Sequence, residues 1–173
     1  MARNSLMKMN LRMLTLAVLL GLALVLTACG GGATGGATGG ATGGASGGTA
    51  AATTLDIGAD GENLAFDKTT LTATAGQPVT VKFKNNSAVQ QHNWVLVNGG
   101  EAVAKPINEG GLTAGVAADY LPADQANVLA HVKVLNGGET GEVSFTAPAA
   151  GTYTYICTVP GHFPLMQGTM TVN

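Results

Sequence analysis

From about residue 53 onward, hydrophobic and polar side chains alternate along the chain in short runs with a period of two. Because successive side chains of a strand point to opposite faces, each run predicts a strand with one buried face. Turn signals rich in glycine, proline and asparagine separate the runs. Short strands at this spacing predict an all-β fold, an antiparallel sandwich or barrel. The predicted strands lie at 79–84, 92–97, 130–134, 143–145, 152–157 and 169–172.

The stretch 101–127 does not fit this pattern. It is rich in alanine and shows no alternation of hydrophobic and polar residues. A connection this long within a compact domain usually has some structure of its own. We therefore predict a short helix in an insertion, at 113–120 or at 122–127.

The N-terminal segment has the pattern of a targeting sequence. Three basic residues, Arg3, Lys8 and Arg12, precede the uncharged apolar run 13–26. A helix of that length spans about 21 Å, which is short of the ~30 Å hydrocarbon core of a bilayer. The run therefore favours a signal-peptide core over a membrane-spanning helix.

The apolar run ends in Leu-Thr-Ala-Cys at 26–29, which resembles a bacterial lipobox. This motif predicts a signal peptide at 1–28 and a lipidated Cys29 as the mature N-terminus. The alternative is an uncleaved membrane anchor with an incidental cysteine. Both possibilities export the domain to the outer, periplasmic side of the cytoplasmic membrane and tether it there.

Residues 29–52 predict a flexible tether. The stretch repeats a Gly-Gly-Ala-Thr-like tetrad and contains no large side chain. Such a chain cannot offset the entropy lost on ordering, and its root-mean-square reach is about 26 Å. The remaining residues, 53–173, are long enough for one ordinary hydrophobic core.

Charge excludes one class of function. The whole chain has 8 Lys+Arg against 10 Asp+Glu, a formal net charge of −2, and three of those basic residues belong to the leader. Removing the leader leaves five basic residues against ten acidic ones, a net charge of −5. A mildly acidic domain has no basic surface for nucleic-acid binding.

The candidate chemistry lies near the C-terminus. Cys157, His162 and Met166 follow the strand 152–157 with the spacing C-x4-H-x3-M, in a loop whose prolines and glycine turn the chain tightly. Thiolate, imidazole and thioether are a soft ligand set that favours copper. A blue copper site also needs a second histidine, and His92 and His131 are the candidates.

His92 is the better candidate, because it opens the strand 92–97, where a ligand can face a neighbouring loop. His131 alternates with apolar residues inside the run 130–134, which predicts a surface histidine. Each ligand also has an ordinary explanation, as a buried cysteine, a solvated histidine or a methionine in the core. Their joint spacing favours a metal site. A disulfide is disfavoured, because Cys29 lies across the flexible tether and is expected to be lipidated.

Two segments resemble azurin-like blue copper proteins, members of the cupredoxin family: HNWVL at 92–96 and CTVPGH at 157–162, followed by Met166. The resemblance covers the chain from about residue 53. It implies a Greek-key β-sandwich of about eight strands with one type 1 copper ion near one end. It also implies that His92, Cys157 and His162 are the equatorial ligands and Met166 the axial ligand.

The same resemblance assigns roles to residues beside the ligands. Asn93 is expected to stabilise the ligand loop by hydrogen bonds, with its own backbone or that of Thr158 near the Cys157 sulfur. Gln91 stands where azurin has a glycine whose carbonyl is a distant fifth contact, so that contact stays open. His162 is the expected exit for the electron, with Pro160, Phe163 and Pro164 as an apolar docking patch. Leu165 flanks the same patch, and packing of the loop is the alternative role for it.

The resulting expectation is a membrane-tethered carrier of single electrons in a photosynthetic or respiratory chain, and not an enzyme. Its expected partners are cytochromes, a quinol-oxidising complex or a reaction centre. The main alternative is a periplasmic protein for copper storage or delivery. A domain of a copper enzyme would need a second histidine-rich site, and zinc bound by cysteine and two histidines is disfavoured by the methionine.

Overall fold

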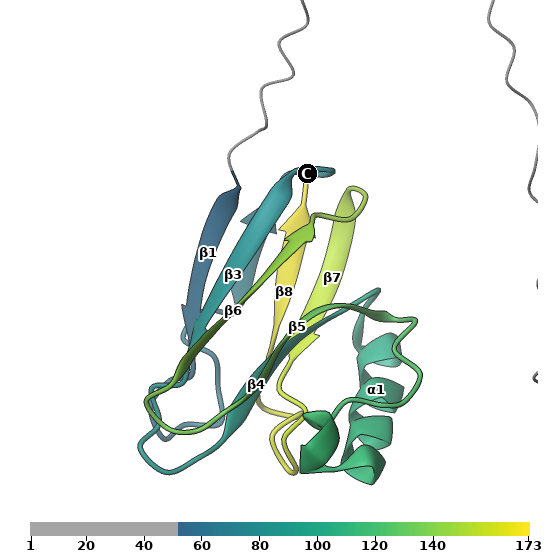
Figure 1. Cartoon of the computed structure of the whole chain (residues 1–173). Helices are drawn as coiled ribbons and strands as arrows, with labels where there is room; N and C mark the ends of the chain where they lie inside the picture. The colour runs from purple at the N-terminus through teal and green to yellow at the C-terminus, as the bar shows by residue number, and fades with distance from the viewer. Residues whose placement is uncertain (1–51) are drawn as a thin grey trace, which may run out of the picture. The chain divides into compact units, whose positions relative to one another are not determined.

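The computed structural model describes residues 52–173 (Figure 1). The predicted signal peptide 1–28, the lipidated Cys29 and the tether up to residue 51 lie outside these residues and remain predictions. Within 52–173, none of the helices has both the length and the apolar character needed to cross a membrane.

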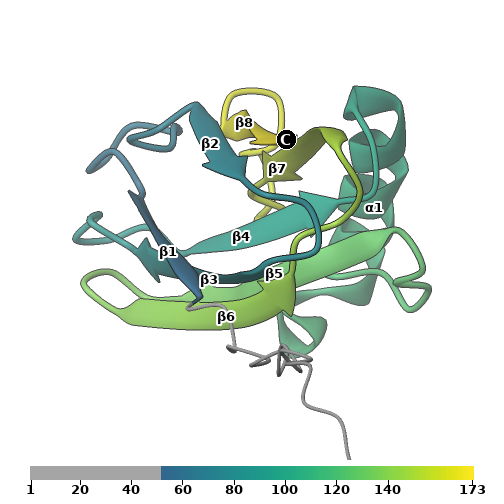
Figure 2. The same ribbon diagram turned by 90° about the horizontal axis from the view of Figure 1, so that it is seen from above.

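Eight strands form two sheets, which confirms the all-β fold (Figures 1 and 2). The smaller sheet has the order β1-β3-β6 and the larger has the order β2-β8-β7-β4-β5. All six strands expected from alternation are present, and two more, β1 and β2, precede them. The strands are β1 (Thr53–Gly58), β2 (Thr70–Ala73), β3 (Pro78–Lys84), β4 (His92–Val97), β5 (Val128–Leu135), β6 (Thr140–Thr146), β7 (Gly151–Ile156) and β8 (Gln167–Val172).

Strand direction differs from the expectation in two places. β1 pairs with β3 in parallel and β2 pairs with β8 in parallel, whereas the other pairs are antiparallel. The first four strands alternate between the sheets, so β1 and β3 are joined through a strand of the other sheet and run the same way. Hairpins give antiparallel neighbours, but a connection that crosses between sheets permits parallel ones.

Both faces of β4 are buried, which is why its pattern alternates so weakly. Trp94 and Leu96 belong to the main core between the sheets, whereas Val95 and Val97 belong to a second cluster with residues of the helix α1 (Glu101–Ala114). α1 therefore covers the outer face of the larger sheet, as Figure 2 shows. A strand packed on both sides is hard to shift, and β4 carries His92.

Aromatic side chains fill the core next to the predicted site. The rings of Trp94 and Tyr155 lie 5.8 Å apart, and Phe66 meets Tyr155 edge-on at 5.2 Å. The Tyr155 hydroxyl donates a hydrogen bond of 2.7 Å to the carbonyl of Lys68. Trp94 follows His92 by two residues and Tyr155 precedes Cys157 by two, so this close packing helps to fix the strands that carry both ligands.

The helix prediction was wrong in position. α1 begins directly after Gly100 and ends at Ala114. The predicted range 113–120 therefore holds only its last two residues and a short 3-10 turn, η1 (Val116–Ala118), and no helix forms at 122–127. α1 contains Pro106 and two consecutive glycines, which are poor helix formers. Its formation depends on burying Ala104 and Ile107 against β4, a tertiary effect that alternation does not reveal.

Gly111 allows α1 to contact the chain that follows η1. A β-carbon at this position would lie 2.0 Å from the carbonyl oxygen of Tyr120, which is backbone and cannot simply rotate away. We expect Gly111→Ala to lower the free energy of unfolding by about 1–3 kcal/mol, because the clash exceeds the gain in helix propensity. Denaturant unfolding of the metal-free protein measures this change.

Gly100→Ala is the matched control for that substitution, because no atom lies within 4 Å of the added carbon. Gly100 is the N-cap of α1, where alanine is only modestly unfavourable, so a change of about 1 kcal/mol or less is expected. Equal effects of the two substitutions would show that the close approach at Gly111 is unimportant.

Candidate metal centre

The topology brings the candidate ligands to one end of the larger sheet. β4 and β7 are antiparallel neighbours, with Val95 opposite Ile156, so the start of β4 meets the end of β7. His92 is the first residue of β4, and Cys157 directly follows β7. The connection from β7 to β8 contains His162 and Met166. Residues far apart in the sequence therefore meet at one place.

Three donor atoms lie close enough to share one ion. Cys157 Sγ is 3.8 Å from His92 Nδ1 and 3.5 Å from His162 Nδ1, and the two nitrogens are 3.2 Å apart. Typical metal distances of about 2.0 Å to imidazole and 2.3 Å to thiolate would place such donors about 3.5–3.7 Å apart in a trigonal site. The observed triangle is close to this size, so the residues fit a three-coordinated metal.

Hydrogen bonds within the loop hold Met166 beside this triangle. The Cys157 N–H donates to the carbonyl of Met166 at 3.0 Å, and the Met166 N–H donates to the carbonyl of His162 at 2.9 Å. Gly161 has φ +84°, a conformation that a side chain would disfavour. Met166 is 0 % exposed, so its thioether is buried at the loop that carries the donors.

Asn93 connects β4 to the ligand loop. Its Oδ1 accepts a hydrogen bond from the Thr158 N–H at 2.8 Å, and its Nδ2 donates to Thr158 Oγ1 at 2.7 Å. These are the loop-stabilising bonds expected for Asn93. At the sulfur, the backbone N–H groups of Asn93 and Val159 bond to Cys157, so the role considered for the Thr158 backbone falls to Val159.

Burial sets the protonation of the metal-free site. It raises the pKa of the Cys157 thiol to about 12, although the two backbone hydrogen bonds act in the opposite direction. Burial lowers the pKa of His92 to about 4, helped by the nearby His162, and burial also lowers the pKa of His162. At neutral pH the site therefore holds two neutral imidazoles and one protonated thiol.

This protonation state predicts a proton count for copper binding. Both imidazoles are already neutral at pH 7, whereas the thiol must lose its proton to become a ligand. We expect one proton to be released for each copper(I) bound between pH 7 and 9, and the affinity to rise about tenfold per pH unit. Calorimetry in buffers with different ionisation enthalpies measures the count. No released proton would mean that the thiolate already exists without metal.

The loop before His92 is held by a residue that the sequence did not indicate. Glu62 accepts hydrogen bonds from Ser87 Oγ at 2.8 Å and from the Ala88 N–H at 2.6 Å, and these bonds lower the pKa of its carboxyl group. Gln91 is exposed, and its side chain donates to Asn136 Oδ1 at 2.9 Å. The Gln91 side chain is thus engaged with the turn between β5 and β6.

The exposed fractions of Phe163, Leu165 and His131 bear on three other expectations. Phe163 was predicted to be part of an exposed docking patch, but it is only 9 % exposed and packs in the second cluster with α1. Leu165, for which both the patch and packing of the loop were open, is 67 % exposed, and Pro160 and Pro164 are exposed as predicted. His131 lies outside the donor triangle and is half-buried, so it is less exposed than predicted.

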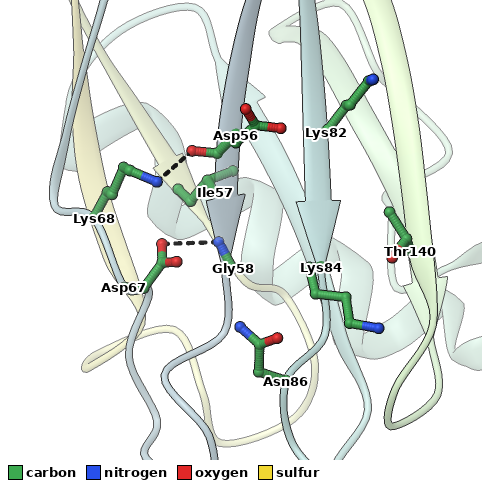
Figure 3. A pocket seen from close by; sticks show the side chains of 9 residues that line it. All are labelled: Asp56, Ile57, Gly58, Asp67, Lys68, Lys82, Lys84, Asn86 and Thr140. Atoms are coloured by element: carbon green, nitrogen blue, oxygen red, sulfur yellow. Dashed lines mark hydrogen bonds between the residues drawn. The ribbon is translucent and has the colours of Figure 1, made fainter.

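A pocket lies away from the donor triangle, lined mainly by residues of β1, of β3 and of the loop that follows β1 (Figure 3). This pocket has a volume of about 200 Å³ and is lined by both lysines and aspartates. Lys68 Nζ donates to the carbonyl of Asp56, and Asp67 Oδ1 accepts from the Gly58 N–H. The side chains of Lys68 and Asp67 thus hold the loop that follows β1 against that strand. Within residues 52–173, His92, Cys157 and His162 form the one cluster with metal-binding geometry.

Comparison with known proteins agrees with this geometry. Residues 53–173 match the family described as copper binding proteins, plastocyanin/azurin family. Auracyanin-A of Chloroflexus aurantiacus is 64 % identical over 167 residues, covering 96 % of this chain and 100 % of the relative. Azurin-1 of Alcaligenes xylosoxydans xylosoxydans is 38 % identical over 128 residues, covering 69 % and 97 %.

Solved structures show the same likeness. Auracyanin A, described as a "blue" copper protein of a green thermophilic photosynthetic bacterium, superimposes with a TM-score of 0.70 at 66 % identity, covering 71 % of this chain and all of its own. The reduced auracyanin of Roseiflexus castenholzii gives 0.68 at 50 % identity, covering 71 % and 98 %. The triangle of buried donors, the cupredoxin fold and these similarities show that this chain belongs to the plastocyanin/azurin family, the blue copper electron-transfer proteins, with copper as its cofactor.

Proposed function

We propose that this protein is a membrane-tethered carrier that passes single electrons between exported or membrane-bound redox partners, and is not an enzyme. The observation that carries the proposal is the enclosure of the donors. His92 and Cys157 are 0 % exposed and His162 is 9 % exposed, so there is little room for a substrate. Bound copper supplies reversible one-electron chemistry with such a ligand set.

His92, Cys157 and His162 take the equatorial positions in this proposal, and Met166 the axial one. The chain holds these groups independently of the metal. Asn93 and Thr158 exchange two hydrogen bonds, and the backbone of Cys157 is bonded to that of Met166. A ligand set that is held by the protein needs little rearrangement when copper gains or loses an electron, and this favours fast electron transfer.

His162 is the proposed exit for the electron, because it is the most exposed of the three donors in the triangle. Its loop also presents Pro160, Pro164 and Leu165 to solvent. An apolar surface of this kind suits a small, rapidly dissociating interface with a redox partner. The proposed partners are cytochromes, a quinol-oxidising complex or a reaction centre of a photosynthetic or respiratory chain.

The proposed patch predicts an effect of Leu165→Asp. Electron self-exchange requires two copies to meet through this surface, and the substitution would place two like charges in the contact. We expect the self-exchange rate to fall about tenfold or more, which corresponds to about 1.4 kcal/mol. Nuclear magnetic resonance of mixed oxidation states measures this rate.

Leu112→Asp provides the matched control, since Leu112 is 43 % exposed on α1 and lies outside the ligand loop. It changes the net charge by the same amount, so its rate should stay close to that of the parent. Equal slowing by both substitutions would show that net charge, and not the patch at His162, controls the encounter.

The proposed anchor depends on the N-terminal segment. The alignment with auracyanin-A covers 167 residues, which is more than the folded part, so the likeness extends into the leader and tether. We propose a signal peptide at 1–28, lipidation at Cys29 and a tether at 29–52 that keeps the copper domain at the outer, periplasmic face of the cytoplasmic membrane. Mass spectrometry of the mature N-terminus would detect either a diacylglyceryl-cysteine or the uncleaved leader.

Copper storage or delivery is the competing function. A carrier should keep its metal through many redox cycles, whereas a delivery protein must release it. We expect rapid self-exchange together with copper loss to a strong chelator that takes hours or longer. Slow self-exchange with ready release of copper would contradict the carrier function and favour storage.

A further inference from the structure

Asp119 occupies an unusual turn between η1 and β5. Its backbone is left-handed, with φ 53° and ψ 27°, and the next residue, Tyr120, has φ 52°. This conformation is disfavoured for residues other than glycine, although aspartate tolerates it better than most. Two such residues in succession persist only where the surrounding structure holds them.

Contacts from two elements hold this turn. The Val134 N–H of β5 donates to Asp119 Oδ1 at 3.0 Å. On the other side, the Tyr120 N–H donates to the carbonyl of Gly115 at 3.0 Å, and Gly111 of α1 approaches the Tyr120 carbonyl closely. The Asp119 carboxylate is thus the side chain that attaches the turn to the larger sheet.

The turn directs one backbone group at the metal centre. The carbonyl of Asp119 accepts a hydrogen bond of 2.9 Å from Nδ2 of Asn93. Asn93 is 0 % exposed, and its other amide groups are occupied by Thr158. Because the Thr158 N–H must face an oxygen, the amide orientation of Asn93 is determined, and its remaining N–H can be satisfied only by Asp119.

Asn93 also lies directly beside the sulfur. Its backbone N–H is hydrogen-bonded to Cys157, while its side chain joins Thr158 and Asp119. A shift of Asn93 would therefore change the hydrogen bond at the sulfur. Such a bond stabilises negative charge on the sulfur, and reduction of the centre increases that charge.

We propose that Asp119 is a positioning residue for the copper centre, which fixes Asn93 and thereby the N–H···S hydrogen bond at Cys157. The insertion that contains α1 and η1 is then a structural support of the ligand loop and tunes the reduction potential. This role rests on the proposed function of Cys157 as a ligand.

Three variants test the role of Asp119 in the full chain. D119G keeps the left-handed conformation but removes the acceptor for Val134, whereas D119N keeps both the conformation and an acceptor oxygen. Both variants lose the carboxylate charge, so a difference between them reports the hydrogen bond from the Val134 N–H. D124G is the matched control, because Asp124 accepts a bond from the Ala126 N–H in the same insertion without contacting Asn93.

Two readouts are compared: the reduction potential of the copper-loaded protein, and the hydrogen exchange of the Asn93 side-chain amide and the Thr158 N–H in the metal-free protein. We expect D119G to have a lower potential than D119N and exchange at least tenfold faster. D119N should exchange like the parent, and D124G should match the parent in both readouts.

The proposal is overturned if D119G and D119N agree in potential and in exchange, or if D124G changes both readouts as much as D119G does. Should D119G fail to fold, D119S takes its place, because serine offers a shorter acceptor. We expect D119S to have a lower reduction potential and faster exchange than D119N, and agreement of the two variants overturns the proposal. If the loaded parent is not blue, the assignment of Cys157 fails, while exchange in the metal-free protein still decides whether Asp119 holds Asn93.

Discussion

Replacement of Cys157 by serine is expected to abolish the blue colour of the copper-loaded protein. An intense visible band requires charge transfer from a thiolate to copper, and Cys157 is the free cysteine of the described residues, with its sulfur at the apex of the donor triangle. Serine is nearly isosteric, but its hydroxyl is a hard, protonated ligand. We expect complete loss of the band and a fall in copper affinity of at least about 100-fold. This fall exceeds the loss of affinity that usually follows when a residue hydrogen-bonded to a ligand is replaced.

Absorption spectra of the parent and the variant after copper loading, with reduction by ascorbate, measure this effect. Cys29→Ser is the matched control, because it changes the other cysteine of the chain, which lies outside the described residues. The parent and the Cys29 variant should both be blue and should bleach reversibly. A blue Cys157→Ser protein, or a colourless parent with bound copper, would contradict the proposed ligand set.

His92→Ala is expected to have the second largest effect. The substitution removes one corner of the triangle, and because His92 is 0 % exposed, the vacated position is poorly placed to be filled from solvent without rearrangement. Removing a ligand therefore should both weaken copper binding by at least about 100-fold and shift or eliminate the blue band. Metal titration followed by absorption and electron paramagnetic resonance measures both changes.

His131→Ala is the control for this second prediction. His131 lies on β5 opposite Val95 and outside the donor triangle. Its removal should leave the colour and the copper affinity unchanged. Retention of a normal blue site in His92→Ala, or its loss in His131→Ala, would mean that the wrong histidine had been assigned to the centre.

Much of the fold follows from local patterns. Alternation located strands such as β3 and β6, because one face of each packs against the core. The position of α1 did not follow, since this helix contains Pro106 and consecutive glycines and is stabilised by contacts with β4. The parallel pairing of β1 with β3 could not be predicted from the residue pattern either, because it depends on how the strands alternate between the two sheets.

The candidate site shows a similar division. Cys157, His162 and Met166 could be recognised because they share one loop, whose tight turns bring nearby residues together. The exposure of Phe163 could not be judged in the same way. An apolar residue in a loop reaches solvent or a core according to its neighbours, and here the neighbours are β4 and α1.

The all-β class, the chemistry of the ligand set and the loop that carries most of it depend on residue type and on short spacing, so they can be predicted from the amino acids alone. The close approach of His92 to Cys157, 65 positions apart in the chain, is visible only in the folded protein. The folded structure also shows that Asp119 is hydrogen-bonded to Asn93, and that Leu165 is exposed whereas Phe163 is buried. The physical reason is that long-range contacts arise from the packing of whole elements, which leaves no periodic signal in the residues that meet.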